Sequence, residues 1–547
     1  MKISSLFNNH KKILFLILGI SIFYSFYRLG ATDLIEWDEA YYSDRVAVVF
    51  YDGEWLDQSS LAYGGLWTGS HPPLVIWIMT ISCKIFGFNE WGLRIPIAMF
   101  GILIIILVFF FTQSLTQNTT LALLSSIILL MISFFIEYTR KAQLDIPVLF
   151  LMMLTVFLFW QSLKKNPYRY AILAGIVLGL GLMSKIIVAF LAVGIIAFFI
   201  VWEFFRGDKK IQSIINLIIL FIIGLLVVLP WHILITQKYG LVYWEQAYGY
   251  HVFKRMSTTL ENHTSVLGIL YWPMEILKKF SGLFPFIILG MFTCSQVQAC
   301  NSQEKRFLWS AFLVPFMIFS LTSTKFHTYF LLFSIPLAIF CAIGIWYTYK
   351  NFSTTSFIML PLSIASLVWV QTHPLHRAFE EIVFSVRNFS FPALQPIISL
   401  GIFIGIFCGM YFLSVKFLIK IKSSKKVQYI LYSIFFVLPI IIMSFNPLIK
   451  SGNDWEKILS IIKEKKAEKI LYVGNTTAVV HFYMKNFLER NTISVEYLPV
   501  NSSEEQINNA LHNVSYCVMG KNNSPQSYKK LSLISETGKL SFYKRIE

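Results

Sequence analysis

Acidic side chains are scarce in this chain, and many of them are gathered in one segment. Only 29 of its 547 residues are Asp or Glu, and eight acidic residues fall between Asp33 and Asp57. The simplest expectation is that most of this segment is a solvated loop. Asp38 and Glu39 differ, because aromatic residues flank the pair on both sides. A carboxylate held among such residues at the edge of a membrane suggests function rather than solvation, so we predict a functional role for Asp38.

A second carboxylate, Asp145, stands in the segment that runs from Arg140 to Pro147. Pro147 would fit the first turn of a helix beginning here, and Asp145 could simply mark that start. The alternative is a second carboxylate that positions a substrate. The local sequence fits both interpretations.

Several cationic or hydrogen-bonding side chains stand near the ends of apolar segments or in the loops between them. They are His71, Arg140, Lys185, His251, Arg255, His263, Lys325 and Tyr329. Arg and Lys bind phosphate through charge-assisted hydrogen bonds, so the set predicts a site for an anionic ligand. Any single member could instead anchor the chain to lipid headgroups.

The composition indicates which elements must hold these residues. Hydrophobic residues make up 56% of the chain and charged residues only 14%, whereas a soluble protein carries about a quarter charged residues. The sequence therefore predicts a polytopic α-helical membrane protein with about thirteen spans. We place them at 12–29, 94–113, 119–137, 146–163, 170–184, 187–205, 213–235, 281–298, 307–323, 327–346, 354–371, 395–418 and 428–446.

The segment 72–88 is also apolar, and the distribution of positive charge decides whether it crosses the membrane. If it does not cross, the basic clusters between spans all fall on the side of the basic N-terminus, which is then cytoplasmic. The +17 charge is explained in this way without a nucleic acid partner. Segment 72–88 becomes a helix at the outer leaflet, and two long external loops follow, at about 30–93 and 236–280. The candidate cations in these loops run against the positive-inside trend, which strengthens the case for an anionic ligand there.

The chain is expected to consist of two domains, a transmembrane domain at 1–447 and an external α/β domain at 448–547. In the second domain, helical periodicity covers Asp454–Lys466 and Ala478–Leu488. Strand patterns cover Lys469–Val473, Ile493–Leu498 and Ser515–Met519, of which the last two read as buried. The six cysteines show no metal-binding spacing. The N-terminal segment reads as a signal anchor, because no small-residue cleavage site follows its apolar run.

The order and spacing of several short motifs resemble one family. These motifs are Asp38-Glu39-Ala40 with Tyr42, Gly53-Glu54-Trp55, His71-Pro-Pro-Leu, Phe86-Gly87, Arg94-Ile-Pro, Arg140 with Asp145-Ile-Pro, Ser184-Lys185, His251 with Arg255 and His263, and Ser323-Thr-Lys-Phe-His-Thr-Tyr329. Together they resemble the GT-C membrane glycosyltransferases that use polyprenyl-phosphate sugars, over about residues 10–345. The protein O-mannosyltransferase-like bacterial enzymes, including the lipid A aminoarabinose transferase, are the most similar. His71 stands where the lipid A enzymes typically have Lys.

The resemblance implies an inverting transferase whose acceptor attacks C1 of a lipid-linked sugar and expels polyprenyl phosphate. Asp38 would be the base, Glu39 its neighbour and Asp145 a second carboxylate. His71, Lys185, Arg255, Lys325 and Tyr329 would bind the leaving phosphate, with Arg140, His251 and His263 as further substrate contacts. The acceptor could be lipid A, a protein hydroxyl or another glycan. A divalent metal on Asp38, Glu39 and Asp145 stays open as an alternative, as does a transporter of lipid-linked sugars. We expect a monomer in a bacterial inner membrane.

Overall fold

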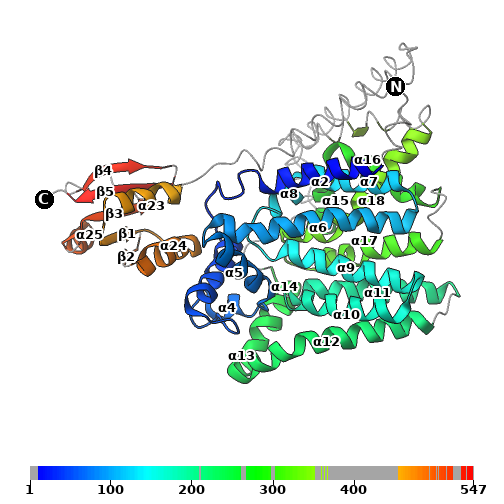
Figure 1. Ribbon diagram of the computed structural model, residues 1–547, viewed down its shortest axis with the longest axis horizontal. Helices are drawn as coiled ribbons and strands as arrows, with labels where there is room; N and C mark the ends of the chain where they lie inside the picture. Colours follow the sequence, from blue (N-terminus) through cyan, green and yellow to red (C-terminus); the bar gives the residue numbers. More distant parts are fainter. Residues whose placement is uncertain are drawn as a thin grey trace, which may run out of the picture. The chain divides into compact units, whose positions relative to one another are not determined.

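The computed structural model (Figure 1) divides into two compact units. It describes residues 10–207, 211–259, 267–296, 302–351, isolated positions between 359 and 366, and 454–545 except 492, 500, 501, 503, 513, 521–530 and 538. The first unit comprises residues 1–25, 100–139 and 145–447, and the second comprises 26–99, 140–144 and 448–547. The predicted spans at 395–418 and 428–446, and most of 354–371, lie outside the described residues.

Long apolar helices make up the first unit, and α6 and α2 continue from it into the second. They are α2 (His10–Phe26), α6 (Glu90–Thr116), α7 (Thr119–Met131), α8 (Ser133–Tyr138), α9 (Asp145–Lys164), α10 (Pro167–Leu182), α11 (Ile186–Phe205), α12 (Ile211–Tyr239), α13 (Leu241–Trp244), α14 (Arg255–Ser257), α15 (Tyr271–Phe280), α16 (Phe284–Thr293), α17 (Ser302–Leu321) and α18 (Leu331–Lys350). Among the described residues, six helices are long and apolar enough to cross a membrane. Each predicted span from 12–29 to 327–346 coincides with a helix or a pair of helices, so the polytopic helical class is confirmed, while the count of thirteen stays a prediction.

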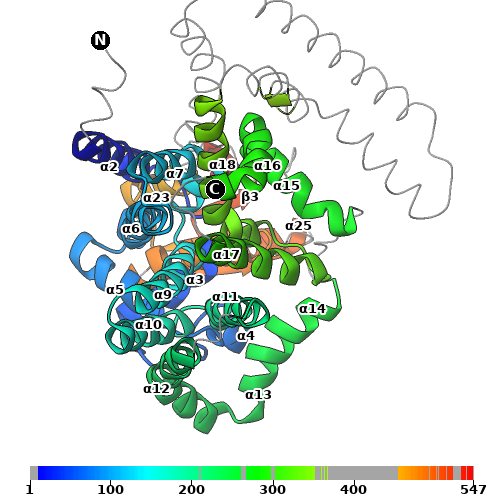
Figure 2. The same cartoon turned by 90° about the vertical axis from the view of Figure 1, so that its right-hand side faces the viewer.

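Close helix packing in this unit depends on glycine. Helix α10 packs against α9 and α12, and α16 packs against α18. A methyl group at Gly290 would overlap the carbonyl of Phe340, and one at Gly344 would overlap the carbonyl of Phe286. Such small residues let helix backbones approach closely where no hydrophobic effect drives helices together. Figure 2 shows α9, α10, α11, α12 and α17 nearly end-on, as neighbouring members of one bundle.

Two predicted spans differ in detail from the helices that form. The span 119–137 is broken at Ile132, whose ψ of 105° ends α7 and separates it from α8. The span predicted from 281 begins ten residues earlier, at Tyr271, and a 3-10 turn over Ser281–Leu283 joins its two halves. The break at Ile132 interrupts apolar sequence, so hydropathy alone gives no sign of it, whereas the 3-10 turn follows Lys278 and Lys279.

Segment 72–88 forms α5 (Leu74–Phe86), which belongs to the second unit. Thirteen residues of helix are about 20 Å long, which is short of the roughly 30 Å of a hydrocarbon core. This length supports the expectation that the segment does not cross. Ile81, Ile85 and Phe86 expose half or more of their surface on this helix.

The tail of the chain forms a five-stranded mixed sheet in the second unit, with strand order β2-β1-β3-β5-β4. The strands are β1 (Lys469–Val473), β2 (Ser494–Leu498), β3 (Tyr516–Gly520), β4 (Leu531–Glu536) and β5 (Leu540–Arg545), and the helices are α23 (Asp454–Glu464), α24 (Ala478–Tyr483) and α25 (Glu504–Leu511). Strand β1 pairs in parallel with β2 and β3, and β5 pairs antiparallel with β3 and β4. The predicted helices and strands form, but β2 is half exposed instead of buried.

The tail does not stand apart from the segment between α2 and α6, because both belong to the second unit. The hydroxyl of Tyr483 donates to Glu90 at 2.6 Å, and it accepts from the backbone N–H of Leu34 at 2.9 Å. The guanidinium of Arg490 donates to both oxygens of Asp52, at 2.8 and 2.6 Å. The tail and this segment therefore form one folded body.

The expectation of a solvated acidic loop holds for Glu36, Asp52 and Glu54, which are exposed, but it is wrong for Asp44 and Asp57. Asp44 and Asp57 are 1% and 4% exposed, and Glu39 is not exposed at all. Asp44 is buried because it accepts hydrogen bonds from the backbone of Tyr63 and the side chain of Asn486, which satisfy the charge inside the fold.

Candidate active site

The Asp38–Glu39 pair begins helix α3 (Asp38–Ala47), in the second unit. Asp38 is half buried, and Glu39 is fully buried. The residue before them, Trp37, has a φ of 71° and exposes 60% of its surface. A bulky residue in this conformation is strained by roughly 1–3 kcal/mol, and such strain is found at functional sites. The backbone therefore turns sharply into the helix that carries the candidate base.

Glu39 is held by four hydrogen bonds. Its Oε1 accepts from Arg94 Nε and from the backbone N–H of Ala142, both at 2.8 Å. Its Oε2 accepts from Arg94 Nη2 at 3.1 Å and from the backbone N–H of Ile35 at 2.8 Å. Both carboxylate oxygens are thus occupied by donors of the fold. The geometry of Glu39 suits a residue that positions the first turn of α3 and thus Asp38.

Arg94 joins this turn to the segment before it. Beyond Glu39, its guanidinium donates to the carbonyls of Leu29, Thr32 and Asp33 at 2.7 to 3.0 Å. Arg94 is 1% exposed, so these bonds form away from water. The sequence places Arg94 in a motif, but its type and position do not predict this structural role.

Arg140 and His71 lie in the same unit as Asp38. Arg140 donates to the carbonyl of Tyr27 at 2.8 Å, and burial together with the charge of Arg94 lowers its pKa to about 10.

The carbonyl of His71 accepts from Arg45 Nη2 at 2.9 Å. Arg45 is fully buried and also donates to Thr68 O and Gln58 Oε1, so it fixes the loop that leads to His71. Burial lowers the pKa of Arg45 to about 10, and sequence reasoning did not find it.

The first unit holds an ion pair between two of the predicted site residues. Lys185 Nζ lies 3.1 Å from Asp145 Oδ1, at the beginnings of α11 and α9 respectively. The second oxygen, Asp145 Oδ2, is buried and accepts no hydrogen bond within the described part of the chain. Asp145 and Lys185 are thus paired, with one carboxylate oxygen left over. That oxygen could accept a hydrogen bond from a substrate.

Lys325 and Arg255 lie on two backbone segments that are hydrogen-bonded to each other. The N–H of Thr324 donates to Arg255 O at 3.3 Å, and the N–H of Ser323 donates to Met256 O at 3.1 Å. The guanidinium of Arg255 lies 4.8 Å from the centre of the Phe326 ring. Residues almost seventy positions apart in the sequence are therefore brought together here.

Lys325 occupies the end of helix α17. Its ammonium donates to the carbonyls of Phe319 and Ser320 at 2.8 and 2.7 Å, which a cation at a helix C-terminus favours. Lys325 is 6% exposed, and burial lowers its pKa to about 8. Tyr329 stacks on Phe319 with ring centres 4.1 Å apart. Both side chains are therefore held by the end of α17.

The remaining predicted residues add less. His251 lies half-buried in the π-helix η2 (Glu245–Lys254), where its ring packs edge-on against Tyr250. His263 lies outside the described residues. Among the residues that the structure describes, no group of three His, Cys, Asp or Glu side chains is arranged to hold a metal ion.

The fold is that of a GT-C membrane glycosyltransferase. A crystal structure of ArnT from Cupriavidus metallidurans bound to undecaprenyl phosphate superposes with a TM-score of 0.61, covering 97% of each chain at 12% sequence identity. The family described as dolichyl-phosphate-mannose-protein mannosyltransferase matches residues 70–234.

Curated proteins extend this relationship. An uncharacterized protein of Aquifex aeolicus (strain VF5) is 26% identical over 205 residues, which cover 37% of this chain and 40% of that protein. The undecaprenyl phosphate-alpha-4-amino-4-deoxy-L-arabinose arabinosyl transferase of Pseudomonas aeruginosa (strain UCBPP-PA14) is 23% identical over 312 residues, or 55% of this chain and 54% of that protein. The chain thus spans about half or less of the relatives that it matches. The relationship that the motifs predicted is confirmed: this chain is a relative of the mannosyltransferase-like and aminoarabinose transferase proteins.

Proposed function

We propose that this chain is an integral-membrane inverting glycosyltransferase, which moves a sugar from a polyprenyl-phosphate donor to an acceptor at the outer face of the membrane. The observation that carries the proposal is the geometry at the start of α3. Four hydrogen bonds saturate Glu39, so it fixes the turn on which the half-buried Asp38 stands. The relatives named above support a polyprenyl-phosphate donor, because one of them binds undecaprenyl phosphate.

The reaction assigns one role to each kind of residue. The acceptor oxygen forms a bond to C1 of the sugar, while the bond from C1 to the phosphate oxygen breaks with inversion. Asp38 takes the acceptor proton, a contribution that is typically worth 10²–10⁴ in rate. The phosphate leaves with the bonding electrons, so its charge rises and cations must meet it. We assign that stabilisation to Lys185, Arg255 and Lys325.

The other candidates contact the substrates around this centre. His71 and Tyr329 would donate hydrogen bonds to the phosphate, while Arg140, His251 and His263 would complete the substrate contacts. Asp145, with one oxygen open, would orient the sugar or the acceptor. The exposed apolar side chains of α5 would contact the polyprenyl chain.

We place the protein in a bacterial inner membrane, with its N-terminus in the cytoplasm and the domain from 448 onward outside. The positive charge of the loops supports this orientation. Lipid A, a protein hydroxyl and another glycan are the acceptor classes that the resemblance permits. A protein O-mannosyltransferase-type reaction would explain His71 at the Pro-Pro motif.

Release of polyprenyl phosphate tests the proposal. Purified protein in membrane lipids is given a panel of polyprenyl-phosphate sugars, and wild type is compared with Asp38→Asn. We expect turnover by wild type and a loss of at least about 100-fold in the variant, because the acceptor loses its base. Glu36→Gln is the matched control, since it removes an exposed carboxylate from the same loop.

Turnover by Asp38→Asn at the wild-type rate would contradict the assignment of the base. Binding of the donor lipid by both proteins, together with its movement across the bilayer and no release of phosphate, would favour a transporter instead.

A further inference from the structure

A cavity of about 250 Å³ lies within the second unit, between the loop after α2 and the tail of the chain. Its lining is mixed in chemistry, with three carboxylates, one ammonium, three hydroxyl groups and two aromatic rings, one of which carries one of these hydroxyl groups. The lining residues are Gly30, Thr32, Asp33, Glu90, Glu456, Leu459, Ser460, Lys463, Tyr483 and Phe487. None of them belongs to the candidate active site.

The volume limits what the cavity can hold. Sites for drug-sized molecules have roughly 300–1,000 Å³, so a space of about 250 Å³ suits a single sugar ring better than a lipid or an oligosaccharide. Phe487 is half-buried at its wall and offers an aromatic surface to a ring. Tyr483 stacks on Trp455, with ring centres 5.1 Å apart and planes 12° apart, so this wall is rigid.

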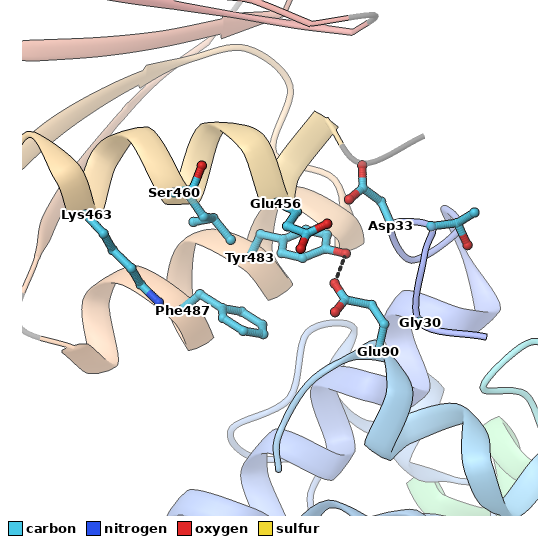
Figure 3. A pocket seen from close by; sticks show the side chains of 10 residues that line it. Gly30, Asp33, Glu90, Glu456, Ser460, Lys463, Tyr483 and Phe487 are labelled. Carbon is cyan, nitrogen blue, oxygen red and sulfur yellow. Dashed lines mark hydrogen bonds between the residues drawn. The ribbon is translucent and has the colours of Figure 1, made fainter. Parts of the chain in front are cut away.

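The charges in the cavity favour a cation over an anion. Figure 3 shows Asp33, Glu90 and Glu456 near the Tyr483 hydroxyl, with Lys463 beside Phe487 at the other end. Three carboxylates against one ammonium would repel a phosphate, although the chain as a whole carries +17. Burial, with the charges of Glu90 and Asp454, raises the pKa of Asp33 to about 6, so the site is fully charged only above that pH.

A metal ion does not fit these carboxylates. Calcium and magnesium need several oxygens converging at 2.0–2.6 Å, and no such group is present among the described residues. Glu90 is committed to Tyr483, and Asp33 Oδ2 accepts from the backbone N–H of Trp455 at 3.1 Å. An organic ammonium group, which needs only dispersed acceptors, suits this arrangement.

We propose that this cavity is a recognition subsite for an amine-bearing monosaccharide unit. The ammonium group lies among Asp33, Glu90 and Glu456, and the sugar ring packs on Phe487. Ser460 and Thr32 exchange hydrogen bonds with the sugar hydroxyls.

The subsite is linked to the candidate base through the backbone. Arg94 binds the carbonyls of Thr32 and Asp33, which line the cavity, and it also binds Glu39 beside Asp38. A ligand in the cavity braces the segment from which α3 begins. On the proposed function, the bound sugar is part of the acceptor.

Binding to the full chain tests this inference without requiring turnover. Glucosamine, glucose and N-acetylglucosamine are titrated into the purified protein in lipid, with the heat of binding or saturation-transfer NMR as the readout. We expect glucosamine to bind at least about tenfold more tightly than the two neutral sugars, and its affinity to fall as the pH drops through about 6, where Asp33 takes up a proton.

Glu456→Gln removes one carboxylate from the cavity, and we expect it to weaken glucosamine at least about tenfold. Glu464→Gln is the control, because it removes an exposed carboxylate from the same helix outside the cavity. Asp38→Asn should leave glucosamine binding unchanged, so failure of the transferase and failure of the subsite are distinguishable.

Equal affinity for glucose and glucosamine, or no binding of either sugar, would overturn the proposal. Loss of glucosamine binding in Glu464→Gln as large as in Glu456→Gln would also overturn it, because the effect would then come from overall charge.

Discussion

Two buried or nearly buried carboxylate–cation pairs lie in different units of this chain, and they differ in what they leave open. Glu39 and Arg94 are both almost completely buried, and both Glu39 oxygens are occupied by donors. Asp145 pairs with Lys185 through one oxygen only, and the other has no partner in the described part of the chain. The first pair therefore serves to hold the fold together, whereas the second keeps one carboxylate oxygen that can accept a hydrogen bond from a ligand.

This contrast teaches that a motif residue and a reacting residue are not the same thing. Glu39 stands beside the candidate base in the Asp38-Glu39 motif, yet both of its oxygens accept hydrogen bonds from the folded loop and its neighbours. Asp145, which the local sequence could explain as a helix start, keeps an acceptor oxygen in a buried setting. The number of donors around each carboxylate separates the two roles.

The largest effect on folding is expected from Glu39→Gln. It leaves the buried charge of Arg94 without a counter-charge, and breaking such a pair costs about 3–5 kcal/mol. The loss of unfolding free energy is measured by unfolding the protein in detergent with heat or denaturant, and Glu36→Gln is the control. If Glu39→Gln unfolds like wild type, Glu39 is not the scaffold residue of the comparison.

Asp145→Asn should show the opposite pattern. We expect turnover to fall about 100-fold, because a misplaced substrate loses alignment, while unfolding changes much less than in Glu39→Gln. Steady-state release of polyprenyl phosphate and thermal unfolding, measured on the same preparation, give both values. A loss of stability as large as that of Glu39→Gln, with turnover intact, would show that the Asp145–Lys185 pair is also part of the scaffold.

Lys325 sharpens the comparison through pH. Its pKa is lowered to about 8 by burial, so its ammonium is present below that pH and is lost as the pH rises through it. Turnover should fall about tenfold between pH 8 and pH 9.5 if this charge meets the phosphate, since each pH unit above the pKa lowers the charged fraction up to tenfold. Lys325→Arg should keep its charge and flatten this part of the profile. The same fall in Lys325→Arg would show that another group titrates.

The smallest effect is expected at an exposed pair in the second unit. Asp52 and Arg490 form a bidentate contact, but their side chains are 29% and 19% exposed. Arg490→Met should cost only about 0.2–1 kcal/mol, and less at high salt. Arg490 lowers the pKa of Asp52, so this stabilisation is present above the ordinary carboxyl pKa of about 4 and is lost as the pH falls below it. A loss of unfolding free energy as large as that of Glu39→Gln would show that burial does not decide how much each ion pair stabilises the fold.

Much of the fold could be predicted from the sequence, because apolar length and periodicity report directly on helices in a membrane. The helices that correspond to the predicted spans from 12–29 to 327–346 follow those ranges, apart from the break at Ile132 and the earlier start at Tyr271, and the first half of the tail also follows its predicted ranges. Helices α3 and α13, in contrast, form in segments that were predicted as external loops. Strands β4 and β5 were not predicted, because Leu531–Glu536 and Leu540–Arg545 carry many polar residues. Neither was the packing of the tail on the first loop, since Arg490 and Asp52 are 438 residues apart.

The candidate site was predicted only in part, because burial of a charge leaves no local signal. The family resemblance already separates Asp38, as the base, from Glu39, as its neighbour, but nothing in the local sequence assigns Glu39, Arg45 and Arg94 to the scaffold. The structure pairs Asp145 with Lys185 and joins the backbone of Arg255 to the segment before Lys325, while a common site for these residues stays a prediction. Backbone hydrogen bonds to Glu39 from the neighbouring Ile35 and from the distant Ala142 decide the difference, and the second of them depends on the whole fold.

The most direct test compares Asp38→Asn with Glu39→Gln in a single-turnover release of polyprenyl phosphate, at equal folded fraction. The account predicts that Asp38→Asn unfolds like wild type but releases phosphate at least about 100-fold more slowly. It predicts that Glu39→Gln is less stable than wild type. Each folded molecule of this variant should nevertheless keep more of the wild-type rate than Asp38→Asn does. Wild-type release by Asp38→Asn, with the rate lost in fully folded Glu39→Gln, would reverse the two roles and contradict the account.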